Sequence, residues 1–482
     1  MKRFIQSKAF GPLLLLIAEY TTKIIGPFIS IILVRYLGVD DYGIYSSAIA
    51  VTSFLTVLPD FGLQQTSLKL STDKGIKLNE LIKSSLYVSL LYTTITFVFL
   101  IGWLHLFKYE KLIKIVAYIL AISFLQLAFR RAMTTLMQIQ RQYTRITIWN
   151  VVINSLQWMT TLFCIYVQAS LIILVLIPQL VILFVAMLML VMEGNKIKLF
   201  SVLNPFKNHI DYKKIVVHSL EFGTANSMYQ VYHRSDALIL SASRNPTEVG
   251  FYNIAFRLAS FVYFFAGVLF NQVLYPLFFK WSKSDRERYL LYYRMLNKLM
   301  ILLGFVATVY ITLFSNDLIT IIFGYTENYA IILLKIMMFA VPFRFLVIST
   351  GAILTTDNLV RERIKIQSKI AVLNVGLNAL LVPIYGGIVA AILMVITDIL
   401  LMTGYILATN KNITTRHFSR RTYFTFPVLI ILSLISLYFS YYGLIFRIVA
   451  GLVLIVPFIT IFILALEKDE LEEIKGLLGR KN

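Results

Sequence analysis

Long apolar runs are the feature that most constrains this chain. Runs of about 20 mostly apolar residues recur from residue 10 to residue 466, and each can cross a hydrocarbon core about 30 Å thick. The composition agrees with this reading, because 59% of the residues are hydrophobic and only 14% are charged. A soluble domain with so few charged groups could not cover its apolar surface. We therefore predict an all-α, polytopic membrane protein.

A window of about 20 residues divides the chain into about 14 transmembrane helices. The predicted spans are 10–34, 42–66, 81–104, 113–137, 146–167, 170–192, 214–240, 249–279, 292–314, 328–355, 366–382, 387–408, 422–440 and 444–466. The first run contains Glu19 and Lys23 and has no small-residue cleavage pattern, so we interpret it as an uncleaved span rather than a signal peptide. An even number of spans places both termini on one side.

The net charge of +21 is explained by basic residues in the predicted cytoplasmic segments and does not indicate a nucleic-acid-binding surface. With both termini cytoplasmic, about 32 Lys and Arg residues fall in inside segments and about 6 in outside segments, as the positive-inside rule requires. Basic segments are not interleaved with exposed aromatic residues, so no nucleic-acid partner is expected. The single cysteine, Cys164, lies in an apolar run, which predicts neither a disulfide nor a cysteine metal site.

Two parts of the chain resemble each other. The segment Y-G-I-Y-S-S-A-I-A-V-T-S-F from Tyr42 matches V-G-F-Y-N-I-A-F-R-L-A-S-F from Val249, and N-V-V-I-N-S-L from Asn150 matches N-V-G-L-N-A-L from Asn374. The matched spans point the same way, which predicts a parallel repeat about an axis along the membrane normal, as in transporters that work by alternating access. The predicted parts are listed in chain order: an N-terminal six-helix bundle at 1–195, a cytoplasmic linker at 196–213, a C-terminal six-helix bundle at 214–410, two additional transmembrane helices at 411–466 and a cytoplasmic tail at 467–482.

Polar and ionisable residues inside the spans fall on helix faces, as residues lining a wet cavity would. Such residues are costly in hydrocarbon and are functional candidates by default. The predicted faces combine Glu19 and Lys23 in the first span with Asp60 and Gln64 in the second, and the seventh and eighth spans add further members. Those are Gln230, Arg234, Asp236, Asn253 and Arg257.

Several of these residues also have a structural interpretation. Glu19 and Lys23 have the spacing of an i, i+4 ion pair, and Arg234 and Asp236 lie on different faces of one helix and would bridge helices. Asp60 follows Pro59 and would cap a kink. We assign structural roles to the remaining charges within spans, which are Arg130, Arg131, Lys335, Arg344 and Asp398.

Short motifs in this order resemble Wzx-type polysaccharide flippases of the multidrug/oligosaccharidyl-lipid/polysaccharide (MOP) exporter superfamily. The motifs are L-V-R-Y-L-G-x-x-x-Y-G-x-Y from Leu33, F-G-L ending at Leu63, R-x-D-A-L-I-L from Arg234 and V-G-F-Y-N-I-A-F-R-L ending at Leu258. The sequences T-K-I-I-G and A-F-R-L are similar to motifs of the related lipid II flippases, which implies that Lys23 and Arg257 are cavity cations. Ile29 stands where that family has another cavity arginine.

The resemblance implies a flippase that moves an undecaprenyl-diphosphate-linked oligosaccharide, such as an O-antigen repeat unit of lipopolysaccharide, across the bacterial cytoplasmic (inner) membrane. Lys23, Arg257 and Arg234 would bind the diphosphate, while Gln64, Asn253 and Gln230 would receive sugars. Asp60, Asp236 or Glu19 would couple transport to protons or sodium, and the membrane potential is a further driving force. No cofactor or metal is expected, and a polysaccharide polymerase and a chain-length regulator are the implied partners. A drug antiporter of the same superfamily and a membrane sugar polymerase or ligase remain alternatives.

Overall fold

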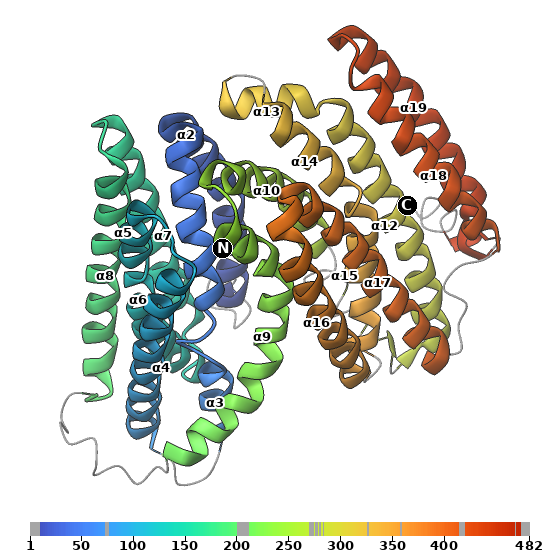
Figure 1. The fold of residues 1–482 in the computed structure, drawn as a ribbon. Coiled ribbons are helices and arrows are strands. Elements are labelled where there is room, and N and C mark those ends of the chain that lie inside the picture. Colours follow the sequence, from blue (N-terminus) through green and yellow to red (C-terminus); the bar gives the residue numbers. More distant parts are fainter. Residues whose placement is uncertain are drawn as a thin grey trace. The chain divides into compact units, whose positions relative to one another are not determined.

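The computed structural model describes residues 10–72, 77–199, 212–268, 274, 278, 281–282, 284–324, 327–356, 359–413, 420–467 and 469–473. Within the helices, this description excludes the side chains of residues 10–24, 27, 225–233, 265, 268, 413 and 420–425. The described residues form helices and no strand (Figure 1). The prediction of an all-α polytopic fold is confirmed.

Contacts divide the chain into two compact units, Met1–Gly250 and Phe251–Asn482. The helices of the first unit are α2 (Phe10–Leu55), α3 (Leu63–Leu70), α4 (Leu78–Leu106), α5 (Lys111–Leu120), α6 (Ile122–Ile139), α7 (Tyr143–Tyr166), α8 (Leu171–Lys196), α9 (Tyr212–Ser243) and the start of α10 (Pro246–Val268). The second unit holds the rest of α10 and α12 (Arg286–Leu313), α13 (Ser315–Phe323), α14 (Asn328–Met338), α15 (Val341–Thr356), α16 (Val360–Tyr385), α17 (Gly387–Ile413), α18 (Arg420–Phe439) and α19 (Leu444–Ala465). The first unit extends past residue 195 because α9 packs against α2, α3 and α4.

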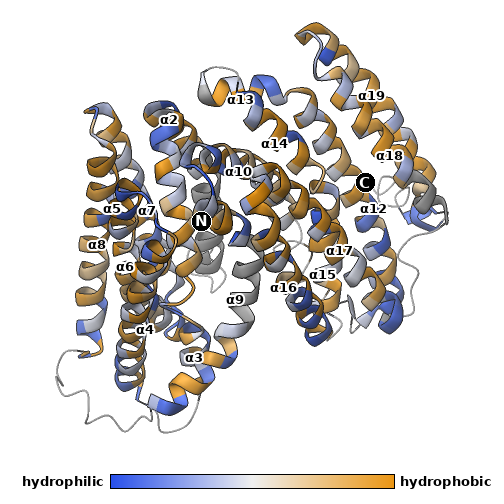
Figure 2. Cartoon of the chain, in the orientation of Figure 1, coloured by the Kyte–Doolittle hydropathy of each residue, from blue (hydrophilic) through white to orange (hydrophobic). Residues whose placement is uncertain are grey.

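Every predicted span overlaps a helix of the described residues. Among the described residues, nine helical segments are long and apolar enough to cross a bilayer, and apolar residues dominate most helices (Figure 2). These segments are Leu78–Leu106, Lys111–Ile139, Tyr143–Tyr166, Leu171–Lys196, Arg286–Leu313, Asn328–Thr356, Val360–Tyr385, Gly387–Asn412 and Leu444–Ala465. The other predicted spans overlap α2, which contains the first and the start of the second, and α9, α10 and α18. Most of the predicted span beyond α10, at 269–279, lies outside the described residues.

The structure also breaks helices that the sequence predicts as continuous. The second span is interrupted between α2 and α3, where Gly62 takes a φ of +79° that a side chain would strain. The tenth consists of α14 and α15, which meet just before Pro342, a residue without an amide hydrogen to donate. The predicted outside loop at 315–328 contains the short helix α13, because Ile319 and Ile322 are buried.

Two glycines paired by the internal repeat touch each other in the first unit. A Cβ atom on Gly250 would lie 3.1 Å from the Cα atom of Gly43, and one on Gly43 would lie 2.3 Å from the Pro246 carbonyl oxygen. The hydroxyl of Thr247 also donates to the Asp40 carboxylate at 2.9 Å, so the start of α10 is held against the kinked middle of α2.

Buried charges in the second unit form ion pairs. Arg344 donates to both carboxylate oxygens of Asp398, at 3.0 and 2.7 Å. Lys298 lies 2.6 Å from Glu470, with both side chains almost completely buried. These pairs connect α12, α15, α17 and the segment after α19. They offset the cost of holding charge away from water, so their effect on stability is modest although breaking one would be costly.

We expect the Gly43→Ala substitution to destabilise the protein, because the new Cβ would collide with the Pro246 carbonyl and force a backbone shift. Overpacking of this kind costs about 1–3 kcal/mol, which would lower the melting temperature in detergent. The matched control is Gly102→Ala in α4, where the added Cβ meets nothing within 4 Å. The control should raise stability slightly, since alanine is the better helix former. Equal melting temperatures for Gly43→Ala and the native protein would contradict the contact.

Candidate functional site

The break between α2 and α3 brings several polar groups of the first unit together. The hydroxyl of Ser89 on α4 donates to the Pro59 carbonyl at 2.7 Å, and the Leu63 amide donates to the Asp60 carbonyl at 2.6 Å. A Cβ atom on Gly62 would lie 2.5 Å from the Ser219 carbonyl of α9, so this turn packs backbone to backbone. The turn therefore fixes Asp60 and the first turn of α3 beside α4 and α6.

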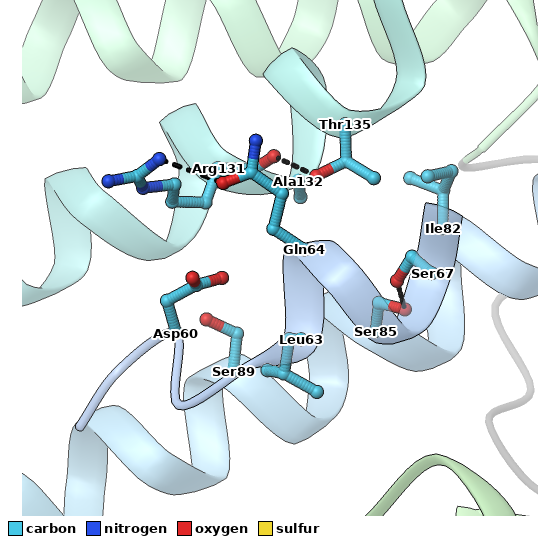
Figure 3. A pocket seen from close by; sticks show the side chains of 10 residues that line it. All are labelled: Asp60, Leu63, Gln64, Ser67, Ile82, Ser85, Ser89, Arg131, Ala132 and Thr135. Atoms are coloured by element: carbon cyan, nitrogen blue, oxygen red, sulfur yellow. Dashed lines mark hydrogen bonds between the residues drawn. The ribbon is translucent and has the colours of Figure 1, made fainter. Parts of the chain in front are cut away.

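A pocket opens between the turn, α3, α4 and α6 (Figure 3). The space inside it is about 250 Å³, a figure that includes open space at the mouth. The enclosed part has room for about one water molecule, so a larger group can meet these side chains only at the mouth. It is lined by Asp60, Leu63, Gln64, Ser67, Ile82, Ser85, Ser89, Arg131, Ala132 and Thr135.

A chain of hydrogen bonds orients the cation of the pocket. The Arg131 guanidinium donates to Gln64 Oε1 at 2.8 Å, as Figure 3 shows, and Gln64 Nε2 donates to Gln138 Oε1 at 2.8 Å. An amide that donates at one end must present its oxygen at the other. Gln138 therefore fixes the direction in which Gln64 accepts, and Gln64 fixes the direction of Arg131.

The charges in this region are not matched one to one. Asp60 attracts Arg131 across the pocket, but the described structure contains no ion pair between the two side chains. Arg130, the neighbour of Arg131 on α6, adds a second positive charge that repels the first. An arginine has five N–H donors, and Arg131 donates to one side-chain acceptor in the described structure. The site can therefore accept an anionic group at the mouth of the pocket.

The structure describes only some of the residues that the sequence predicts for the site. It brings Asp60 and Gln64 together in one pocket, although the helix break means that they do not share one continuous helix face. The side chains of Glu19, Lys23 and Gln230 lie outside the described residues.

The remaining predicted residues lie on α9 and α10. On α9, Arg234 is exposed and Asp236 is buried, whereas Asn253 and Arg257 on α10 are half-buried. Among the described residues, no three His, Cys, Asp or Glu side chains gather as a metal site would require.

Arg131 is the pocket residue that the sequence analysis missed. It was assigned a structural role, yet its hydrogen-bond partner lies 67 positions away in the sequence. The available signal was the pair Arg130–Arg131 within an otherwise apolar run. Two adjacent arginines point about 100° apart on a helix, so they cannot share one partner direction, and charges inside a span are functional candidates by default.

Comparisons with known proteins agree with the predicted resemblance. A family model described as "Polysaccharide biosynthesis protein" matches residues 32–330. The structure of the lipid II flippase MurJ in an inward closed conformation is similar, with a TM-score of 0.70, 16% identity and coverage of 93% of this chain and 98% of that one. No curated protein matches this chain.

An inward-facing multidrug resistance MATE transporter of the MOP superfamily is also similar. Its TM-score is 0.53 at 13% identity, with coverage of 79% of this chain and 94% of that one. At these identities the likeness shows the fold, while the family match covers more than half of the chain. The chain therefore belongs to the polysaccharide biosynthesis protein family and has the polytopic fold shared by MurJ and the transporters of the MOP superfamily.

Proposed function

We propose that this protein moves an undecaprenyl-diphosphate-linked oligosaccharide from the cytoplasmic to the outer leaflet of the bacterial cytoplasmic membrane by alternating access. The family match and the MurJ-like fold support a lipid-linked substrate. The observation that carries the proposal is the oriented cation Arg131 in a polar pocket of the first unit. The proposed activity of the protein is transport and not the making or breaking of sugar bonds.

The diphosphate is the part of the substrate that is hardest to move across the membrane. The isoprenoid tail can remain in lipid and the sugars can remain in water, whereas the anion must leave water and enter a medium that penalises charge. Charge-assisted hydrogen bonds from a guanidinium are the strongest compensation that a side chain offers. In this mechanism Arg131 and Arg130 receive one phosphoryl group near the inner end of α6, and Asp60 attracts Arg131 when the anion has left.

The size of the pocket limits what it binds. Its enclosed part is no larger than about one water molecule, so in the proposal a phosphoryl group meets Arg131 at the pocket mouth and the sugars stay outside the pocket. Following the family resemblance, Lys23, Arg257 and Arg234 supply further positive charge for binding, while Asn253 and Gln230 contact sugars. The inside-negative potential favours outward movement of the anion by about 2.3 kcal/mol per charge per 100 mV, and Asp60, Asp236 or Glu19 would serve coupling to an ion gradient.

Deletion of the gene in its native host tests the function itself. The expected result is accumulation of a lipid-linked repeat unit in the cytoplasmic leaflet, where it resists a glycan-labelling reagent applied from outside. Expression of the native protein should restore labelling. Normal surface polysaccharide with no accumulated lipid-linked intermediate would refute the proposal.

Arg131→Ala should reduce export strongly. Removing a charge-assisted hydrogen bond costs roughly 1.5–3 kcal/mol, which corresponds to about 10- to 100-fold. The measurement is the rate at which glycan becomes accessible outside, normalised to the amount of inserted protein. Arg131→Lys should retain part of the rate. The control Arg361→Ala removes an exposed arginine of the second unit and should leave export unchanged; an Arg131→Ala rate like that of the control removes Arg131 from the mechanism.

Gln138→Leu should have a smaller effect of the same kind, because it removes the acceptor that orients Gln64 without changing any charge. A neutral hydrogen bond contributes about 0.5–1.5 kcal/mol, so a decrease of about 2- to 10-fold is expected. In the Arg131→Ala background the Gln138→Leu change should add nothing, since the residue it positions is gone. Full additivity in this double-mutant cycle would show that Gln138 acts elsewhere.

Arg257→Ala on α10 should abolish export while the protein stays inserted in the membrane. The reason is the loss of a cavity cation that the family resemblance implies. Export measured by outside labelling, together with the amount of protein in washed membranes, checks this expectation. Preserved export would exclude Arg257 from substrate binding.

A further inference from the structure

A second cluster of charges lies at one end of the second unit. It is formed by α13, the last turn of α14, the turn between α18 and α19, and the first turn of α19. The Asn316 amide donates to the Ser440 carbonyl at 3.4 Å, which joins α13 to the α18–α19 turn. The charge distribution of the loops assigns this end to the outside of the membrane.

Arg447 supplies the first cation of the cluster. Its guanidinium donates to both oxygens of Asp317, at 2.5 and 3.1 Å, and its side chain is 8% exposed. Its Nε atom is buried and has no acceptor among the described residues. Arg447 lies in the first turn of α19, which has no acidic residue and no side-chain cap. The partial positive charge of that helix end therefore adds to the charge of Arg447.

Lys335 supplies the second cation, and no carboxylate balances it in the described structure. The residue is 5% exposed, and its ammonium nitrogen lies 4.1 Å from the centre of the Tyr441 ring. Arg447 is near enough to repel it, and the Asp317 carboxylate is already engaged by Arg447. Two buried cations and a helix N-terminus thus share one carboxylate.

The ring of Tyr441 alone does not compensate for this burial. A cation–π contact offsets only part of the cost of burying a charge without a counter-charge. The described residues supply no hydrogen-bond acceptor to the Lys335 ammonium, and the ring that covers it, Tyr441, is itself exposed. The exposed tyrosines Tyr438, Tyr441 and Tyr442 surround this end, and tyrosine is typical of the headgroup level of a bilayer.

We propose that Lys335, Arg447 and the N-terminal turn of α19 form a binding site for the phosphate headgroup of an anionic lipid of the outer leaflet. Lys335 contacts the phosphate, Arg447 and the helix end contribute positive potential, and the Tyr441 ring borders the site. The acyl chains lie along the apolar outer surfaces of α18 and α19, where Ile431, Leu434, Ile445 and Leu452 are exposed. This site is separate from the pocket at Arg131 and does not depend on the proposed transport activity.

The test measures binding of fluorescent phosphatidylglycerol to the full-length protein purified in neutral detergent. Native protein should bind phosphatidylglycerol at least about tenfold more tightly than phosphatidylcholine, and Lys335→Gln should remove about that factor. Lys335→Arg, which keeps the charge, should retain the preference. The control Lys108→Gln removes an exposed lysine of the first unit and should bind like the native protein.

Three results would overturn the proposal: equal binding of the two lipids by native protein, an unchanged preference in Lys335→Gln, or full competition by inorganic phosphate at the concentration of the lipid headgroup. The last result would assign the site to a free anion. If Lys335→Gln does not fold, native mass spectrometry of the unaltered protein released from phosphatidylglycerol vesicles decides the matter. Retained phosphatidylglycerol supports the site, and its complete absence refutes it.

Discussion

A charge inside a bilayer must be neutralised or hydrated, and this requirement orders the whole molecule. In the second unit, Arg344 and Lys298 meet buried carboxylates that hold helices together. In the first unit, Arg131 meets an amide instead. An amide orients a guanidinium without cancelling its charge, so Arg131 keeps its ability to bind an anion. The same residue type is thus structural in one unit and available for function in the other.

The break between α2 and α3 makes the arrangement around Arg131 possible. A continuous helix would point Asp60 and Gln64 along one face, because they are four residues apart. The turn at Pro59 and Gly62 instead moves Asp60 off the helix and places Gln64 in the first turn of a new one. The turn is stabilised by the Ser89 hydrogen bond and by close backbone packing at Gly62, both of which depend on parts of the chain distant in sequence.

The difference between local and distant interactions explains which features could be predicted from the sequence. Apolar length is a local property, so the positions of the spans follow from it, and the polar nature of Asp60 and Gln64 within a span marked them as candidates. The role of Arg131 depends on a partner in another helix, and that pairing has no periodic signal. Likewise, Pro59 indicated a kink, but only the packing of α9 against Gly62 determines that the helix stops there. The α13 segment was taken for a loop because its nine residues are too few to span a membrane.

The meeting of Gly43 with Pro246 and Gly250 has a mechanical consequence. Main-chain atoms form its closest contacts, and the buried side chains of Tyr42 and Val249 flank them. Each van der Waals pair contributes only about 0.1–0.2 kcal/mol, so the contact depends on a close fit over many atoms. Because both glycines lack a Cβ atom, the main chain alone sets the spacing of the two helices at this point.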